Sequence, residues 1–224
     1  MDVLVTGADT VVGRTIAQAY HAAGHRLVVT GTHRDELESV ARELGADAVI
    51  CDCADPTSLA DAQTRFPHHL DTVVIVPAQN ENPRAATLAD AAAAWRQAFD
   101  GTVIAAVLTV QTVAEHLRSG GSIVCVLPGQ DSRSESVDTA AAAAKAALSS
   151  WTTSQADHFG TRGITINTVA AGRTRQPGYD GLTEAPPAAA GESARLTVFL
   201  SPPAARHITG QTLHVGRGAA ISYS

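Results

Sequence analysis

The chain has 224 residues, 45% of them hydrophobic and 17% charged, with a mean hydropathy of +0.03 and a formal net charge of −6. This composition suits one globular domain with a sizeable core and excludes a disordered chain. The negative charge and a pI of about 5.8 argue against a surface for nucleic acid. No apolar run reaches the roughly 18 residues that a membrane-spanning helix needs, and no signal-peptide pattern is visible. We therefore expect neither a nucleic-acid partner nor a membrane.

The three cysteines, Cys51, Cys53 and Cys125, have neither the pattern of a disulfide framework nor the spacing of a zinc site. No other metal-binding spacing is visible, so no metal is expected. Cys51 and Cys53 would lie on the same side of one strand, where we interpret them as small core hydrophobes. Free cysteines of this kind indicate a reducing compartment, the cytoplasm.

Apolar, strand-like runs alternate with helical patterns along the whole chain. The expected strands cover residues 3–5, 26–30, 48–51, 71–76, 122–127, 164–169 and 211–215. The expected helices cover residues 12–23, 35–44, 87–117, 137–159 and 193–200, with a further one opened by Asp55 as N-cap and Pro56 at its first position. Gly120 and Gly121 are expected to end the longest helix. The alternation predicts an α/β fold, a doubly wound parallel sheet of about seven strands in a single domain spanning residues 1–224.

Residues 3–15, VLVTGADTVVGRT, place a strand, a glycine turn and a helix in that order. This arrangement presents a helix N-terminus, with its N–H groups and positive dipole end, to the phosphates of a dinucleotide. The candidate cofactor-binding residues of this turn are Gly7, Thr10, Val11, Val12 and Gly13. The middle of the turn has no glycine, and the β-branched Val11 places methyl groups where a pyrophosphate would approach. The turn therefore predicts the fold more firmly than the ligand.

The residues after the second strand indicate which dinucleotide would bind. An acidic residue there would favour NAD, because it hydrogen-bonds the ribose hydroxyls. This strand instead ends at Thr30-Gly31 and is followed by Thr32, His33 and Arg34. A basic group without a carboxylate suits a 2′-phosphate, so NADP(H) is the expected cofactor if one binds. The alternative is that Arg34 is a solvated residue at a helix start.

Six segments, in the same order along the chain, resemble the short-chain dehydrogenase/reductase (SDR) family. They are TGADTVVG, Cys51-Asp52, GSIVCVL, AAAAKAAL, ITINTVAAG and ITGQTLHVGRG. The resemblance covers essentially the whole chain. It implies a Rossmann-type fold and, as the family's activity, hydride transfer with NAD(P)(H).

In that family the active-site helix carries a tyrosine four residues before a lysine, on the same helix face. The lysine lowers the pKa of the phenol and binds the nicotinamide ribose, while the tyrosine transfers the proton. Here Lys145 matches the lysine, but Ala141 stands at the tyrosine position. Pro128 stands at the position of the family's serine, and Thr102 at that of its helical asparagine. Lys145 is thus the one retained member of the expected catalytic set.

Further cofactor contacts are implied by the resemblance alone. Asp52, followed by Cys53, matches the acidic residue that contacts the adenine, although an Asp after a strand is also a common turn residue. Ala78 lies in the segment that replaces the family's Asn-Asn-Ala-Gly sequence. Lys145 would bind ribose hydroxyls, or it is an exposed lysine on an alanine-rich helix. The family's substrate lid is shortened here to residues 173–190.

Two hypotheses of function remain open. The first is an SDR-like protein without the family's Ser-Tyr-Lys catalysis, acting as a cofactor-binding or oligomer-partner subunit. The alternative is an active NADP(H)-dependent oxidoreductase that acts on an unknown carbonyl or alcohol substrate through other residues. The family's main dimer interface maps to the helices expected at 87–117 and 137–159. We therefore expect a homodimer or homotetramer, or a hetero-oligomer with a related enzyme.

Overall fold

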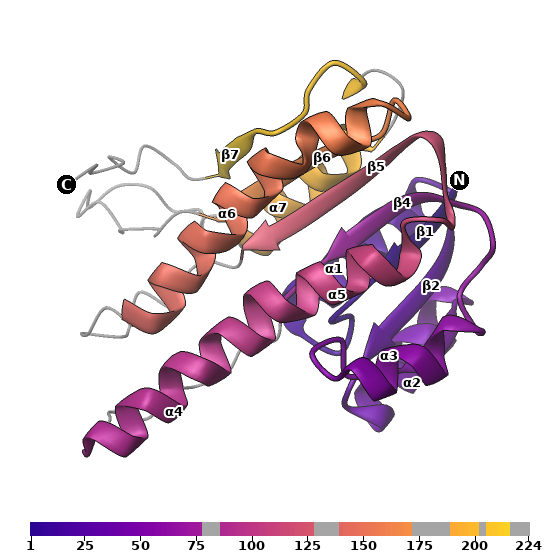
Figure 1. Ribbon diagram of the computed structural model, residues 1–224. Helices are drawn as coiled ribbons and strands as arrows, with labels where there is room; N and C mark the ends of the chain where they lie inside the picture. Colours follow the sequence, from indigo (N-terminus) through magenta and orange to yellow (C-terminus); the bar gives the residue numbers. More distant parts are fainter. Residues whose placement is uncertain (78–85, 128–138, 172–188, 202–204, 216–224) are drawn as a thin grey trace, which may run out of the picture.

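The computed structural model describes residues 1–77, 86–127, 139–171, 189–201 and 205–215. Within these residues, seven parallel strands form one sheet in the order β3-β2-β1-β4-β5-β6-β7 (Figure 1). The strands are β1 (Asp2–Val5), β2 (Arg26–Gly31), β3 (Asp47–Ile50), β4 (Leu70–Ile75), β5 (Leu117–Leu127), β6 (Thr165–Ala171) and β7 (Thr212–Val215). The helices are α1 (Val11–Ala22), α2 (Arg34–Leu44), α3 (Pro56–Gln63), α4 (Leu88–Phe99), the π-helix η1 (Asp100–Ile104), α5 (Ala105–Val113), α6 (Thr139–Gly160) and α7 (Ala189–Leu200). The expected α/β sheet is confirmed.

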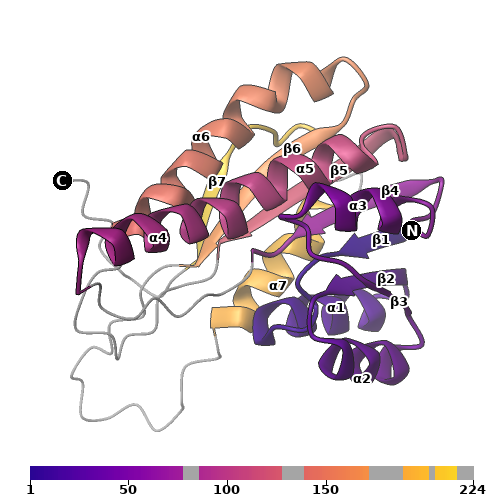
Figure 2. The ribbon, with the colours of Figure 1, turned by 60° about the horizontal axis from the view of Figure 1, so that its bottom comes forward.

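Helices cover both faces of this sheet (Figure 2). One core cluster packs α1, α2 and α7 against strand residues that include Val3 and Val74. The other packs α3, α5 and α6 against alternate strand residues, among them Leu4 and Val73. Val73 and Val74 are adjacent in β4 and both fully buried, because a parallel sheet covered on both sides buries successive side chains. This is why the sequence shows continuous apolar runs in its strands.

Side-chain caps determine where two of the helices begin. Asp55 accepts a hydrogen bond from the Thr57 N–H at 3.0 Å ahead of α3, which confirms its expected capping role. Thr87 and Asp90 form a capping box before α4, in which each side chain accepts the backbone N–H of the other residue. The helix expected from residue 87 therefore starts where the sequence predicts.

The middle and end of that helix differ from the prediction. It contains the π-helical turn η1, and α5 ends at Val113. The prediction that Gly120 and Gly121 end the helix is wrong, because both lie inside β5, which begins at Leu117. The pairing of β5 with β4 is irregular here, and a Cβ on Gly121 would lie 2.9 Å from the Asp71 carbonyl oxygen. The glycines thus serve an irregular strand start.

Smaller differences affect other expected elements. Cys51 and Cys53 follow β3 rather than lying on it, although both pack against the core cluster as expected of small hydrophobes. The helix α7 begins at Ala189 rather than at residue 193. None of the helices described is long and apolar enough to cross a lipid bilayer. The expected lid lies outside the described residues over 173–188, as do Ala78 and Pro128.

Candidate functional site

The candidate cofactor-binding residues gather at one edge of the sheet. All the strands are parallel, so the turns that follow β1, β2 and β3 lie at the same, carboxyl-terminal edge. The sheet order places β1 beside β4, and the chain leaves these strands toward helices on opposite faces. Ligands of open α/β sheets bind at such a switch point. The structure therefore brings the turn at residues 7–13, the turn at residues 32–34 and the turn at residues 52–53 to the expected edge.

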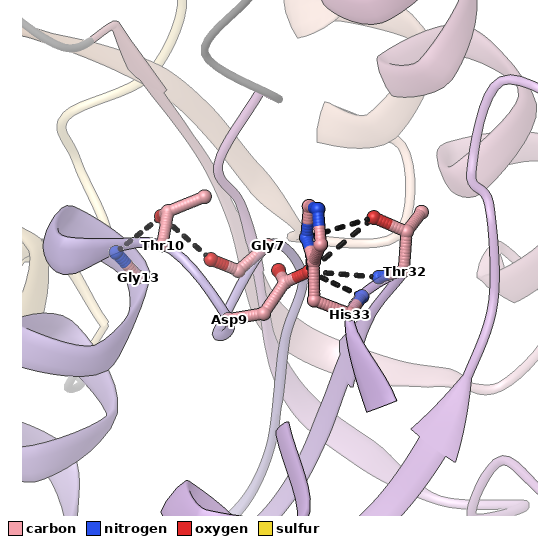
Figure 3. A network of polar contacts seen from close by, with 6 residues as sticks. All are labelled: Gly7, Asp9, Thr10, Gly13, Thr32 and His33. Atoms are coloured by element: carbon pink, nitrogen blue, oxygen red, sulfur yellow. Dashed lines mark hydrogen bonds and ion pairs between the residues drawn. The ribbon is translucent and has the colours of Figure 1, made fainter. Parts of the chain in front are cut away.

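The turn between β1 and α1 closes without a central glycine. The Thr10 hydroxyl donates to the Gly7 carbonyl at 2.7 Å and accepts from the Gly13 N–H at 3.1 Å (Figure 3). Gly7 has a φ of 61°, and a Cβ there would lie 2.5 Å from the Val76 carbonyl oxygen. A Cβ on Gly13 would lie 2.0 Å from the Gly7 carbonyl oxygen. Both glycines are therefore required by packing within the protein.

The first turn of α1 leaves two backbone donors for an anion. Thr10 caps the Gly13 N–H with its side chain and the Arg14 N–H with its carbonyl group. The N–H groups of Val11 and Val12 have no hydrogen-bond partner in the described part of the chain. These donors and the helix dipole fit a pyrophosphate. Val11 is 78% exposed, so its side chain stands at the surface beside the same donors.

The carboxylate of Asp9, which is not among the candidates from the sequence, accepts the hydrogen bonds of the turn after β2. Asp9 Oδ2 accepts the backbone N–H groups of Thr32 and His33, each at 2.9 Å, and the Thr32 hydroxyl at 3.4 Å (Figure 3). The His33 Nδ1 also lies 2.9 Å from this oxygen. The Asp9 side chain is only 4% exposed. The available signal was an acidic residue inside a glycine turn, together with a glycine at the end of the second strand.

The residues expected to bind a 2′-phosphate are already engaged with carboxylates. The backbone donors of Thr32 and His33 are taken by Asp9. Arg34 forms an ion pair with Glu38 at 3.1 Å on the surface of α2. The turn therefore exists as predicted, but an internal carboxylate occupies its anion-binding donors. The unpaired N–H groups at the start of α1 fit a pyrophosphate, whereas the Thr32 and His33 N–H groups at this turn are occupied by Asp9.

Asp52 plays the part of a turn residue. Its Oδ1 accepts the Ala54 N–H at 2.9 Å, and its own N–H donates to the Ser58 hydroxyl oxygen at 2.9 Å. The thiols on either side of it interact with each other. A hydrogen bond from Cys53 lowers the pKa of Cys51 to about 7, and the same bond with burial raises the pKa of Cys53. No cluster of metal-ligating side chains occurs among the residues that the structure describes.

The remaining candidates lie on two helices that pack together. Ala141 and Lys145 are one helical turn apart on α6, and both are half-buried. Thr102 is buried in η1, and α6 contacts η1 and α4 through the alanine cluster Ala98, Ala140 and Ala144. A π-helical turn inside a longer helix is frequently found at a functional site. The structure thus places the residues at the expected tyrosine, lysine and asparagine positions on neighbouring elements.

Comparisons with known proteins agree with this geometry. A family model described as enoyl-(acyl carrier protein) reductase matches residues 7–220. A solved structure described as a short chain dehydrogenase/reductase family protein is 29% identical, with a TM-score of 0.76 over 96% of this chain and 95% of that one. The chain belongs to the short-chain dehydrogenase/reductase family. The SDR family comprises NAD(P)-dependent oxidoreductases.

Two further proteins show how far the SDR likeness extends. Rv1856c of Mycobacterium tuberculosis, named as a presumed oxidoreductase, is 55% identical over 222 residues, 98% of each chain. BdcA, a protein of E. coli solved in complex with NADPH, has a TM-score of 0.78 at 24% identity over 96% of this chain and 92% of its own. The first likeness covers almost the whole length at high identity, and the second shows the shared SDR fold.

Proposed function

We propose that this chain is an SDR protein that binds a nicotinamide dinucleotide but lacks the family's tyrosine-dependent proton transfer, and that it acts as a cofactor-binding or oligomer-partner subunit. One observation carries this proposal: Ala141 stands one helical turn before Lys145 on α6. A general acid must lie within hydrogen-bond reach of the reacting oxygen. The methyl group of Ala141 has no proton to transfer, so the expected acid is missing from the helix that should hold it.

Dinucleotide binding is supported by the free donors of α1. The N–H groups of Val11 and Val12 would hold the pyrophosphate, and Lys145 would bind ribose hydroxyls. When bound, the cofactor would supply hydride chemistry. NADP(H), the cofactor expected from His33 and Arg34, agrees with the NADPH complex of BdcA but is opposed by the carboxylate of Asp9.

The rarity of lysine in this chain supports a cofactor-binding role for Lys145. Lysine and arginine together number 16 in the chain, and Lys145 is the one lysine. Every other cation is an arginine, including those in the surface ion pairs formed by Arg14, Arg26 and Arg34. An ordinary solvated cation in this protein is therefore an arginine. A lysine at the position that the SDR resemblance assigns to ribose binding favours the functional interpretation, because a compact ammonium and a planar guanidinium are not interchangeable.

An active oxidoreductase is the second candidate. The name of Rv1856c and the description of the matching family model favour it, as does the π-helical turn around Thr102. In this case water or another residue would supply the proton, and the substrate would be a carbonyl compound or an alcohol.

The two candidates separate in one set of measurements. Calorimetric titration with NADH and NADPH should give saturable binding, whereas a panel of carbonyl compounds and enoyl thioesters should cause no oxidation of either cofactor. An amine-reactive label can modify only Lys145 and the N-terminal amine, and mass spectrometry of peptides distinguishes the two sites. Bound cofactor should reduce the labelling of Lys145. The Lys145→Ala variant should bind the cofactor more weakly. Arg118→Ala serves as the control, because it removes a cation from β5 rather than from α6. Substrate-dependent turnover would contradict the non-catalytic proposal, and absence of binding would contradict the cofactor site.

Self-association is the second part of the proposal. The helix α4 exposes Leu88 almost fully, and Trp95, which stacks on Phe99 at 6.3 Å, is 44% exposed. The adjoining helix α6 exposes small residues, Ala142 and Ala146, which would allow close approach of another helix. We propose that this face of α4 and α6 forms a homodimer or homotetramer. A purified chain that stays monomeric would instead favour a hetero-oligomer with a related enzyme. Light scattering should give at least twice the chain mass of 23.1 kDa.

Because all three cysteines are free, we propose a reducing cytoplasm as the compartment.

A further inference from the structure

The last residue of β2 is a glycine, but the carboxylate of Asp9 lies beside it. In dinucleotide-binding sheets, an acidic residue at this point hydrogen-bonds the ribose hydroxyls. Here the position is Gly31, and a Cβ on it would lie 2.4 Å from both Cγ and Oδ1 of Asp9. The Asp9 carboxylate therefore fills the space in which a side chain at position 31 would begin. It reaches this place from the turn between β1 and α1.

The carboxylate is held in one orientation. Its Oδ2 receives the backbone N–H groups of Thr32 and His33 and contacts the His33 ring, from residues 23 and 24 positions away in the chain. All the hydrogen bonds that the described residues make to this carboxylate end on Oδ2, and none ends on Oδ1. One oxygen is thus used to fix the group, and the other remains an acceptor. A ribose hydroxyl is a donor that this acceptor could receive without displacing the internal bonds.

The charges around this turn disfavour an added anion. The guanidinium of Arg34 already pairs with Glu38, and the His33 ring already contacts Asp9. A phosphate monoester carries a charge of about −1.5 to −2 near neutral pH. A 2′-phosphate would therefore meet a fixed, largely buried carboxylate in a turn whose cations already have acidic partners.

We infer that Asp9 selects NAD(H) over NADP(H) by acting from the glycine turn as the acidic residue that β2 lacks. The inference rests on the proposed dinucleotide site and names the ligand that this site takes. Asp9 would receive a ribose hydroxyl on Oδ1 and repel a 2′-phosphate. The basic residues His33 and Arg34 do not reverse this preference, because each is engaged with a carboxylate.

The test compares the dissociation constants of NADH and NADPH, measured by calorimetry on the full chain. The wild type should bind NADH at least about tenfold more tightly than NADPH. Asp9→Asn removes the charge and should bring the two constants close together. Asp35→Asn is the control, because it removes an exposed carboxylate in the first turn of α2 that makes no bond with Asp9, and it should leave the ratio unchanged.

A second variant keeps the test valid even if Asp9→Asn fails to fold. The double variant Asp9→Ser with Gly31→Asp returns the carboxylate to the strand end, and it should recover the preference for NADH. The melting temperature of each variant shows whether it is folded. Equal or tighter binding of NADPH by the wild type, or an unchanged ratio in Asp9→Asn, would overturn the inference while leaving the dinucleotide site in place. Absence of binding for both cofactors would overturn the site and the inference together.

Discussion

The Asp9 carboxylate and the α-carbon of Gly31 occupy adjoining space, so that no side chain fits at position 31 while Asp9 keeps its bonds. Gly31→Ala should therefore destabilise the protein by about 1–3 kcal/mol, the usual cost of overpacking. Urea unfolding measures this. Gly191→Ala is the control, because a Cβ at that α7 position meets no atom within 4 Å.

The same relationship predicts coupling between the two positions. In an Asp9→Ala background the carboxylate is absent, so Gly31→Ala should cost much less than it does in the wild type. The four unfolding free energies of this double-mutant cycle give the interaction directly. An identical penalty in both backgrounds would show that the strain at position 31 comes from elsewhere.

Thr10 holds the start of α1 by capping the Gly13 N–H. Thr10→Ala should lower the free energy of unfolding by about 1 kcal/mol, the typical value of a lost N-cap. Thr10→Ser keeps a hydroxyl at the same place and should retain most of the stability. If the serine variant loses as much as the alanine variant, the capping bond is not the source of the effect.

Tyr20 links α1 to α7, because its hydroxyl contacts the Thr197 carbonyl oxygen at 3.1 Å and the Ser201 hydroxyl. Burial raises the pKa of Tyr20 above its usual value. Folding therefore favours the protonated phenol, and the resulting stability is present below the ordinary pKa of about 10 and declines as the pH rises above it.

The measurement is urea unfolding between neutral pH and pH values above the ordinary tyrosine pKa. Tyr20→Phe should cost about 1 kcal/mol near neutral pH through the lost hydrogen bonds. It should also lose less of its remaining stability than the wild type as the pH rises, because the phenol that must ionise is gone. Parallel pH profiles for the two proteins would contradict this role of Tyr20.

The exposed aromatic side chain of Trp95 predicts where self-association occurs. Trp95→Glu places a charge on the α4 face and should shift the mass measured by light scattering toward a single chain. Phe199→Glu is the matched control, because Phe199 is also an exposed aromatic residue, 50% accessible, but lies on α7. An unchanged mass for Trp95→Glu, with a reduced one for Phe199→Glu, would move the proposed interface to α7.

The strands and most helices were predictable because their signals are local. Apolar runs such as β4 and caps such as Asp55 act within a few residues, and the structure confirms the elements they predicted. The π-helical turn η1 and the early start of β5 were not predictable in this way. Both depend on how the chain packs against elements far away in sequence, as the irregular pairing of β5 with Leu70 and Thr72 shows.

The sequence by itself determined the doubly wound sheet, the dinucleotide-type turn and the identity of the residue one helical turn before Lys145. These depend on hydrophobic periodicity, on chain order and on the chemistry of a single side chain. Only the tertiary structure decided where the carboxylate at the end of β2 comes from. Asp9 and Gly31 belong to different strand–helix units, and they meet because β1 and β2 pair in parallel and end at the same edge of the sheet. A contact of that kind leaves no periodic signal in the sequence, since it is created by strand pairing rather than by neighbouring residues.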